Sequence, residues 1–206
     1  MTLHLHPILR QSFATIDREI GAHHFSDDQY QVVRRVIHST ADFEFLTLLR
    51  FSAEVISTAT AALAAGIPIV TDVQMVSMGI QTVVQQTFQN PVITAVEAGQ
   101  SPLPGQTRTA AGMLHCTQAY PEAVYVVGNA PTALLALCQQ LTVAAQSPPL
   151  IIGVPVGFIG VLEAKEALAT SGLPHIRTEG RKGGSPVAAA IVNALLTLAW
   201  QQRTVH

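Results

Sequence analysis

The chain has 206 residues, of which 49% are hydrophobic and 12% are charged, which fits one large domain over residues 1–206 better than two small ones. Its formal net charge of -2, from 11 Lys and Arg against 13 Asp and Glu, provides no basic field to hold a phosphate backbone, so we expect no nucleic-acid partner. Aromatic residues make up only 5%, and small aliphatic residues supply most of the apolar volume. That composition is typical of an α/β protein whose sheet is buried under helices.

Cys116 and Cys138 lack CxxC spacing and are too few for a disulfide scaffold, so we expect free, buried thiols in a reducing compartment. No apolar run reaches the roughly 18 residues of a membrane helix. The first ten residues do not show a basic region followed by an apolar stretch, so no secretory signal is expected. We therefore expect a cytoplasmic protein that does not enter the membrane.

Two amphipathic helices are predicted at the start of the chain. Apolar positions recur at helical spacing over residues 8–20, and Gly21 ends that helix. A second helix, capped within residues 26–28, carries an apolar stripe up to His38. This places His38 at a helix C-terminus or in the loop that follows.

The remaining chain alternates between helical and strand patterns. A helical pattern over residues 51–65 precedes a short buried strand over 67–72. Further strands are predicted at Val92–Val96, Val124–Val127, Leu150–Val154 and His175–Arg177, and further helices at Thr107–Gln118, Pro131–Ala144, Leu162–Ser171 and Pro186–Gln202. The alternation predicts an α/β fold: a single three-layer domain with a mostly parallel sheet flanked by helices. Ligands should bind at the carboxyl ends of its strands. Gln100–Gln106 is expected to be an exposed loop.

Three predicted strands lead into loops rich in Gly, Asn and Pro, over residues 128–132, 153–157 and 180–184. Glycines let the backbone approach a ligand, and the helix starts behind them offer N–H donors to anions, so a ligand with many carboxylates would suit these loops. The alternative is that these residues only make tight turns. Because no loop matches GxGxxG or a Walker A sequence, a nucleotide-binding Rossmann enzyme is a weaker interpretation.

Several charged residues border these loops. Arg181 and Lys182 could pair with carboxylates, and Arg108 at a helix start could reach the same crevice; solvated surface charges are the alternative. Asp72 follows the first strand and is expected to cap the next helix rather than to contact a ligand.

His38 is the most useful acid/base candidate, because imidazole titrates near neutral pH and Asp42 is close enough in sequence to orient it. On residue type alone, a histidine at a helix end more often caps carbonyl groups than catalyses. The sequence contains no GxSxG nucleophile elbow, so a serine hydrolase is not favoured. No metal site is expected, because the other histidines lack ligand spacing and are expected at the surface or in loops: His23, His24, His115 and His175.

Several short motifs occur in a fixed order along nearly the whole chain: Ser12, Arg34-Arg35-Val-Ile-His38 with Asp42, Asp72–Val76, Thr107–Gly112, Gly128–Thr132, Gly153–Phe158, Glu163–Lys165 and Gly180–Ser185. Each is weak alone. Their joint order and spacing resemble the precorrin-8X methylmutase family, also called precorrin isomerase or cobalt-precorrin-8 methylmutase. Where that family often has Glu-Ser-Lys, this chain has Glu163-Ala164-Lys165, so any hydroxyl contact there is absent.

The resemblance implies a homodimeric isomerase of cobalamin biosynthesis. It would catalyse a 1,5-sigmatropic methyl shift from carbon eleven to carbon twelve of precorrin-8X or its cobalt form, giving hydrogenobyrinate or cobyrinate. The family's acid/base histidine corresponds to His38, acting at ring C, and its substrate contacts look similar to Ser12 and Arg35. The remaining expected substrate contacts, on the loops and at helix starts, are Arg108, Asn129, Thr132, Gly157, Arg181, Lys182 and Ser185. No cofactor is implied, because any cobalt travels inside the substrate. A corrinoid-binding or channelling protein without significant turnover stays open as the alternative.

Overall fold

The computed structural model describes residues 6–99, 102–144 and 147–204. Six strands form one sheet: β1 (Leu49–Phe51), β2 (Ile69–Thr71), β3 (Val92–Thr94), β4 (Val124–Val127), β5 (Ile151–Gly153) and β6 (His175–Thr178). Their order across the sheet is β1-β6-β5-β4-β2-β3. All neighbouring pairs are parallel except β1 and β6, which are antiparallel.

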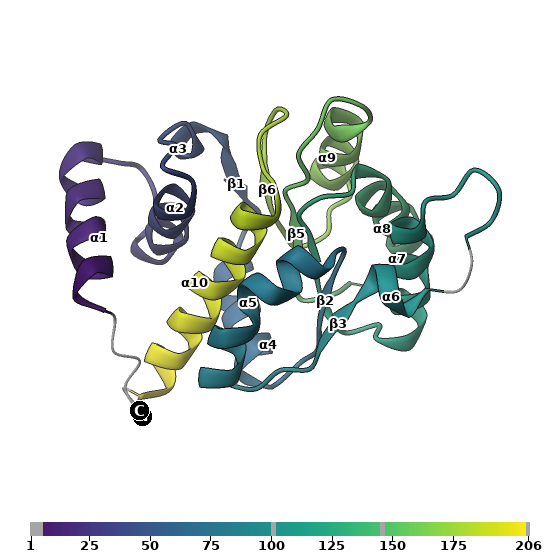
Figure 1. Ribbon diagram of the computed structural model, residues 1–206, viewed down its shortest axis with the longest axis horizontal. Coiled ribbons are helices and arrows are strands. Elements are labelled where there is room, and N and C mark those ends of the chain that lie inside the picture. The colour runs from purple at the N-terminus through teal and green to yellow at the C-terminus, as the bar shows by residue number, and fades with distance from the viewer. Residues whose placement is uncertain (1–5, 100–101, 145–146, 205–206) are drawn as a thin grey trace.

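Ten helices accompany these strands in the described ranges: α1 (Pro7–Ile20), α2 (Asp27–Thr40), α3 (Phe45–Leu48), α4 (Val55–Ala64), α5 (Gln74–Gln86), α6 (Ala95–Ala98), α7 (Arg108–Ala119), α8 (Pro131–Ala144), α9 (Val161–Thr170) and α10 (Ser185–Thr204). Figure 1 shows α10 crossing in front of the sheet, with α1 and α2 on one side and α7, α8 and α9 grouped on the other. Helices therefore cover both faces of the sheet.

Alternate residues of the central strands supply the two hydrophobic cores. In β4, Val124 and Val126 pack with α2, α4, α5 and α10, whereas Tyr125 and Val127 pack with α7, α8 and α9. A strand buried on both faces reads as a continuous apolar run, as Val124–Val127 does. The predicted three-layer α/β fold is thus confirmed.

Local signals explain where the helices begin and end. Gly21 ends α1, and Ser26 caps α2 through a capping box with Gln29, so the chain satisfies the free N–H groups of that helix start. Helix α2 continues to Thr40, which places His38 in its last turn rather than in the next loop.

Several predicted elements have shifted boundaries, and two of these shifts have a clear structural cause. The helical pattern predicted over residues 51–65 begins only at Val55, because Leu49–Phe51 forms β1 against β6. A three-residue strand is too short to show an alternating pattern. The strand predicted over Val92–Val96 stops at Thr94, where α6 begins.

Helix α5 was not among the predicted helices, although a helix was expected after Asp72. Gly79 interrupts its pattern, and glycine is a poor helix former. The residue is needed for close packing, because a Cβ at Gly79 would lie 2.8 Å from the Cβ of Ala189 on α10.

Both cysteines are free and buried, as predicted. The loop predicted over Gln100–Gln106 begins with two residues outside the described ranges, and residues 102–105 are exposed. The surface or loop position expected for His175 is wrong: it starts β6, is buried, and its Nδ1 lies 2.8 Å from the Leu173 carbonyl oxygen. Within the described ranges, no helix has the length and apolar character needed to cross a membrane.

Candidate functional site

The loops that follow β5 and β6 lie side by side at the carboxyl edge of the sheet. The Gly184 N–H donates to the Val154 carbonyl at 2.8 Å, and the Gly157 N–H donates to the Arg181 carbonyl at 3.4 Å. Gly183 lies so close to Val154 that a Cβ there would be 2.2 Å from the Val154 oxygen, so only glycine fits. Two of the three loops predicted to share one crevice are therefore in direct contact.

The loop after β4 is organised differently, because its backbone N–H groups already bind an anion within the chain. The Asp72 carboxylate accepts hydrogen bonds from the N–H groups of Gly128, Asn129 and Ala130, at 3.1, 2.7 and 2.8 Å. Both carboxylate oxygens accept, which matches the hydrogen-bonding capacity of a carboxylate. Burial raises the pKa of Asp72, and the N–H donors act in the opposite direction.

This arrangement corrects two predictions. Asp72 does not cap α5: the N-cap residue of that helix is Val73, and the Asp72 carboxylate binds the loop after β4 instead. The N–H group of Asn129 faces Asp72 and is not free for a ligand, so only the exposed Asn129 side chain remains as a candidate contact.

His38 is exposed in the last turn of α2 and has a defined neighbourhood. Its ring meets the Phe13 ring edge-on, with 5.5 Å between the ring centroids. Burial, followed by the positive charge of Arg35, lowers the pKa of His38 below its usual value. The imidazole is therefore mostly neutral at pH 7 in the free protein.

The end of α2 is tied to the loop after β6. Lys182 Nζ lies 2.7 Å from an Asp42 carboxylate oxygen and 3.0 Å from a Glu44 carboxylate oxygen. The hydrogen bond from Lys182 lowers the pKa of Asp42. Because Asp42 comes four residues after His38, this contact brings His38 to the edge of the sheet where the loops lie.

The same contact overturns the expected Asp42–His38 pair. The Asp42 carboxylate accepts from Lys182 and from the Glu44 N–H group, and not from the His38 ring. Lys182 is consequently engaged by two acidic side chains, whereas Arg181 has no acidic partner among the described residues and lies 5.8 Å from the Phe158 ring centroid.

The other predicted substrate contacts fall into two groups, one near the end of α2 and one at the starts of α7, α8 and α10. Beside His38, Ser12 is partly buried next to Phe13 and donates to the Ile8 carbonyl at 3.0 Å. Arg35 is partly buried one turn before His38, and burial lowers its pKa. Arg35 therefore lies near His38, and Ser12 is adjacent in sequence to Phe13, which contacts the His38 ring.

On the other side, Arg108 is the first residue of α7 and is exposed, and its guanidinium contacts the Val96 carbonyl at 3.4 Å. The Thr132 hydroxyl lies 2.8 Å from the Thr107 hydroxyl, which joins the starts of α7 and α8. Ser185 begins α10 and is buried. Helices α8 and α10 follow β4 and β6, whose carboxyl ends lie at this edge, and the contact between Thr107 and Thr132 brings the start of α7 beside that of α8.

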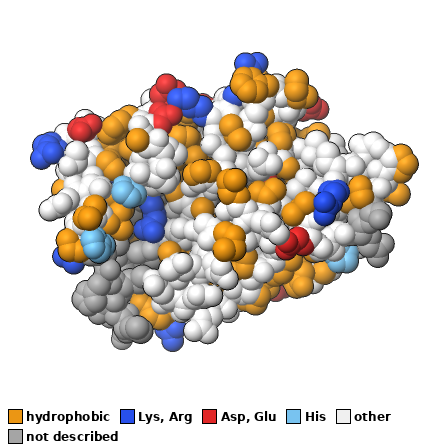
Figure 2. Space-filling view, in the orientation of Figure 1, with side chains coloured by type: hydrophobic (Ala, Val, Ile, Leu, Met, Phe, Trp, Pro, Cys, Tyr) orange, Lys and Arg blue, Asp and Glu red, His pale blue; other side chains and the backbone are white. Residues whose placement is uncertain are grey.

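Large apolar side chains are exposed at the same edge. Met75 and Met78 at the start of α5 are 68% and 67% exposed, and Phe158 and Ile159 in the loop after β5 are 82% and 89% exposed. In Figure 2, hydrophobic side chains and Lys or Arg side chains lie next to one another at the top of the molecule, where Figure 1 places the loop after β6 and the start of α9. An apolar surface with cations at its margins suits a large apolar ligand that carries carboxylates.

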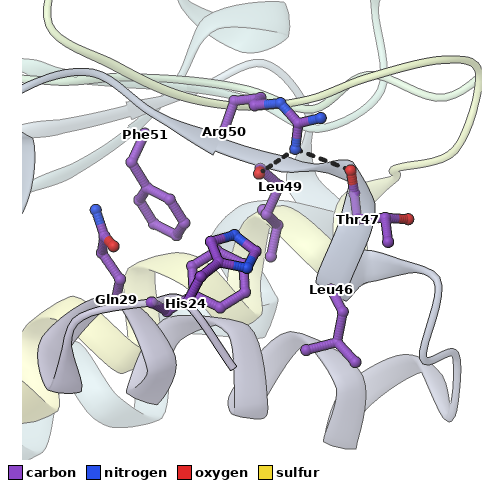
Figure 3. Close-up of a pocket in the computed structure, with 8 residues that line it drawn as sticks. His24, Gln29, Leu46, Thr47, Leu49, Arg50 and Phe51 are labelled. Carbon is purple, nitrogen blue, oxygen red and sulfur yellow. Dashed lines mark hydrogen bonds between the residues drawn. The ribbon is translucent and has the colours of Figure 1, made fainter. Parts of the chain in front are cut away.

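A pocket of about 440 Å³ lies elsewhere, beside the edge strand β1 and the first turn of α2 (Figure 3). Its only charged lining residue, Arg50, donates to the Thr47 and Leu49 carbonyls and pairs with Glu179 at 2.6 Å. The Arg50 guanidinium is therefore already paired within the chain. Nowhere in the described ranges do three His, Cys, Asp or Glu side chains gather as a metal site.

Replacing Arg35 by Met is expected to raise the pKa of His38, because the neighbouring positive charge that disfavours imidazolium is removed while the burial stays. An NMR titration of the His38 ring in the free protein measures this directly and needs no substrate. A matched Arg203→Met variant changes an exposed residue of α10 and should leave the pKa of His38 unchanged. An unshifted titration in Arg35→Met would contradict the proximity of the two groups.

The fold and this edge define an α/β protein with a histidine, cations and exposed apolar side chains gathered where parallel strands end. The family model for precorrin-8X methylmutase matches residues 7–198. A cobalt-precorrin-8 methylmutase of Synechocystis is 54% identical over 96% of this chain and 97% of its own length, and a precorrin-8X methylmutase of Pseudomonas aeruginosa is 40% identical over 92% and 94%. The solved structure of a precorrin-8X methylmutase from Thermus thermophilus superposes with a TM-score of 0.88 at 38% identity, covering 96% of this chain and 99% of that one.

The chain therefore belongs to the precorrin-8X methylmutase family, as its ordered motifs indicated. Methylmutases are isomerases, so the predicted class of enzyme, in cobalamin biosynthesis, is confirmed as well.

Two residues at the site had no predicted role. Phe13 lies on the apolar stripe of α1, and its contact with His38 depends on how α1 packs against α2. Lys165 lies on the buried face of α9, with Val161, Ala164 and Leu168. A lysine among the apolar positions of a helix is visible in the sequence and could have marked Lys165 as a residue with a specific role.

Proposed function

We propose that the chain catalyses the 1,5-sigmatropic methyl shift from carbon eleven to carbon twelve of precorrin-8X or its cobalt form, giving hydrogenobyrinate or cobyrinate. His38 is the residue proposed to exchange a proton with ring C. The observation that carries this proposal is the position of His38 at the end of α2, tied through Asp42 and Lys182 to the loop after β6. A histidine there can face a ligand held over the exposed apolar side chains.

A sigmatropic shift needs no nucleophile, so the protein's task is to hold the reacting tautomer and stabilise the migrating state. In the free protein His38 is mostly neutral, because burial and Arg35 lower its pKa. A substrate carboxylate that pairs with Arg35 would offset the guanidinium charge and raise the pKa of His38. Substrate binding would in this way produce the imidazolium that donates the proton.

Binding would use apolar contact and charge pairing together. The macrocycle would lie on Met75, Phe158 and neighbouring apolar side chains, and its carboxylates would meet Arg35, Arg108 and Arg181. Asn129, Thr132 and Ser12 would supply further polar contacts. Gly157 and Ser185 would let the loop backbone approach the ligand.

Changing both loop cations, Arg181→Ala with Lys182→Ala, is expected to weaken product binding by roughly tenfold or more, because charge-assisted hydrogen bonds to carboxylates are lost. The single Arg181→Ala variant should carry most of this loss, since Lys182 is engaged by Asp42 and Glu44. Absorbance titration with hydrogenobyrinate measures the Kd, and Arg203→Ala is the matched control. An unchanged Kd in the double variant would remove this loop from the binding site.

We further propose that the enzyme acts in the cytoplasm as a homodimer, and that it needs no cofactor of its own because cobalt enters and leaves within the macrocycle. Incubation with metal-free and cobalt-loaded substrate, side by side, tests the reaction and the metal preference together. A change of the visible spectrum to that of the conjugated product supports the methylmutase. Binding without conversion would support a carrier that hands the corrinoid to the next enzyme.

A further inference from the structure

Lys165 is a buried lysine without an acidic partner. It is 2% exposed, on the face of α9 that packs against the sheet. Its ammonium donates to the carbonyl oxygens of Gly180 and Lys182, both at 2.8 Å. No described carboxylate forms an ion pair with it.

Burying this charge is unfavourable, and an apolar side chain would fit the stripe without that cost. Burial, and then the nearby positive charge of Arg177, lower the pKa of Lys165 to about 8. What an apolar side chain cannot do is donate hydrogen bonds to the two carbonyls. These bonds join α9 to the loop after β6, which rises beside α9 in Figure 1.

The loop held by Lys165 carries the cations of the candidate site. The Lys182 carbonyl accepts from Lys165 and also from the Thr178 hydroxyl at 2.9 Å, while the Lys182 side chain reaches Asp42. One residue is therefore fixed through its backbone from α9 and through its side chain from the end of α2. Gly180, Gly183 and Gly184 all have positive φ, so the loop backbone has little conformational preference of its own.

We propose that Lys165 is a positioning residue of the substrate site, whose hydrogen bonds to the Gly180 and Lys182 carbonyls hold the loop so that Arg181 faces the substrate and Lys182 reaches the end of α2. This inference rests on the proposed function, because it assigns the loop to the binding of substrate carboxylates. Lys165 itself does not touch the substrate. It acts through the loop backbone.

Steady-state kinetics of Lys165→Met provide the first test. We expect KM for precorrin-8X to rise ~10-fold, the factor expected for losing one or two charge-assisted hydrogen bonds, with a smaller change in kcat because His38 stays in place. Lys165→Arg, which keeps a cationic donor, should recover part of the KM. Glu166→Gln changes the charge of the adjacent, exposed residue of α9 and should match wild type. A KM within twofold of wild type in Lys165→Met would overturn the proposal.

Amide hydrogen exchange tests, without any substrate, whether Lys165 stabilises the loop after β6. The Gly184 N–H group, bonded to Val154, should exchange ~10-fold faster in Lys165→Met while the amides of β4 keep wild-type protection. Unchanged exchange over residues 180–184 would count against Lys165. Failure of the wild-type protein to bind or convert any corrinoid would instead overturn the proposed function, so the two failures are distinguishable.

A pH profile, measured first on the wild-type protein, separates this role from simple core packing. The charged group that acts on Lys165 is Arg177 on β6. In the adjoining loop Glu179 pairs with Arg50 and Arg177, and the acidic partners of Lys182 raise the pKa of Lys182. In the wild-type protein KM should rise between pH 7 and pH 9, as the ammonium of Lys165 loses its proton and its bonds lose their charge assistance. A flat wild-type profile, or the same rise in Lys165→Met, would refute the assignment.

Discussion

His38→Ala is expected to lower the turnover of precorrin-8X ~100-fold or more, the lower part of the range for losing a positioned general acid or base. Ligand affinity should change little, because the exposed apolar side chains and the cations remain. The fold should also remain, since His38 is exposed and its described contact is one ring edge against Phe13. Single-turnover absorbance with saturating substrate measures the chemical step apart from binding.

His115→Ala is the matched control, because His115 is an exposed histidine in a helix on the other side of the sheet. His38→Asn separates two roles of the ring: the amide can donate a hydrogen bond but cannot exchange a proton near neutral pH. Turnover close to wild type in His38→Ala would remove His38 from the mechanism. Retained turnover in His38→Asn alone would make it a hydrogen-bond donor to ring C.

Elements with strong local signals were predicted closely from the sequence. Helix α8 occupies Pro131–Ala144 as expected, because a proline suits the first turn of a helix and an apolar run follows it. The start of α2 was likewise predicted within residues 26–28, from side chains that can cap free N–H groups. Strand β1 was missed because its three residues form a strand only through pairing with β6, more than 120 positions later.

The carboxylates show the limit of reasoning from neighbours in sequence. Its position in the sequence pairs Asp72 with the helix that follows it, but its partners are 56 to 58 residues away in the loop after β4. Sequence proximity likewise pairs Asp42 with His38, four residues before it. The observed partner of Asp42 is Lys182, which is 140 residues away and carries a full positive charge. A carboxylate contacts a neighbour in sequence only when the tertiary structure places no stronger hydrogen-bond or ionic partner beside it.

The candidate site also combines residues that the sequence predicts with a contact that only the tertiary structure creates. Residue chemistry singles out His38 and the glycine loops, and the family motifs add Ser12 and Arg35. The contact between the end of α2 and the loop after β6 instead depends on how the layers stack. Without that contact, His38 would be an exposed helix-end histidine with no relation to the other loops. The contact between Lys182 and Asp42 is what joins the separate motifs into one site.

Asp72→Ala is expected to destabilise the protein more than any other single change discussed. It would leave the N–H groups of Gly128, Asn129 and Ala130 without their acceptor, and an unsatisfied buried donor costs ~1–3 kcal/mol. We expect the free energy of unfolding to fall by ~3–5 kcal/mol, a large part of the ~5–15 kcal/mol of a typical domain. Guanidinium unfolding with a constant m-value measures the loss. The exposed control Glu122→Ala should stay within about 0.5 kcal/mol of wild type.

Chemical rescue makes this prediction specific to the anion rather than to lost packing. In Asp72→Ala the three N–H groups would still point into the vacated position just before α8, which is a binding site for a small carboxylate. Added acetate or formate should therefore raise the stability of Asp72→Ala more than that of the wild-type protein, in which Asp72 fills the position. Asp72→Asn keeps one oxygen acceptor and should lose less stability, with little gain from acetate. A loss below about 1 kcal/mol in Asp72→Ala would show that water satisfies the three N–H groups, and that the loop does not depend on Asp72.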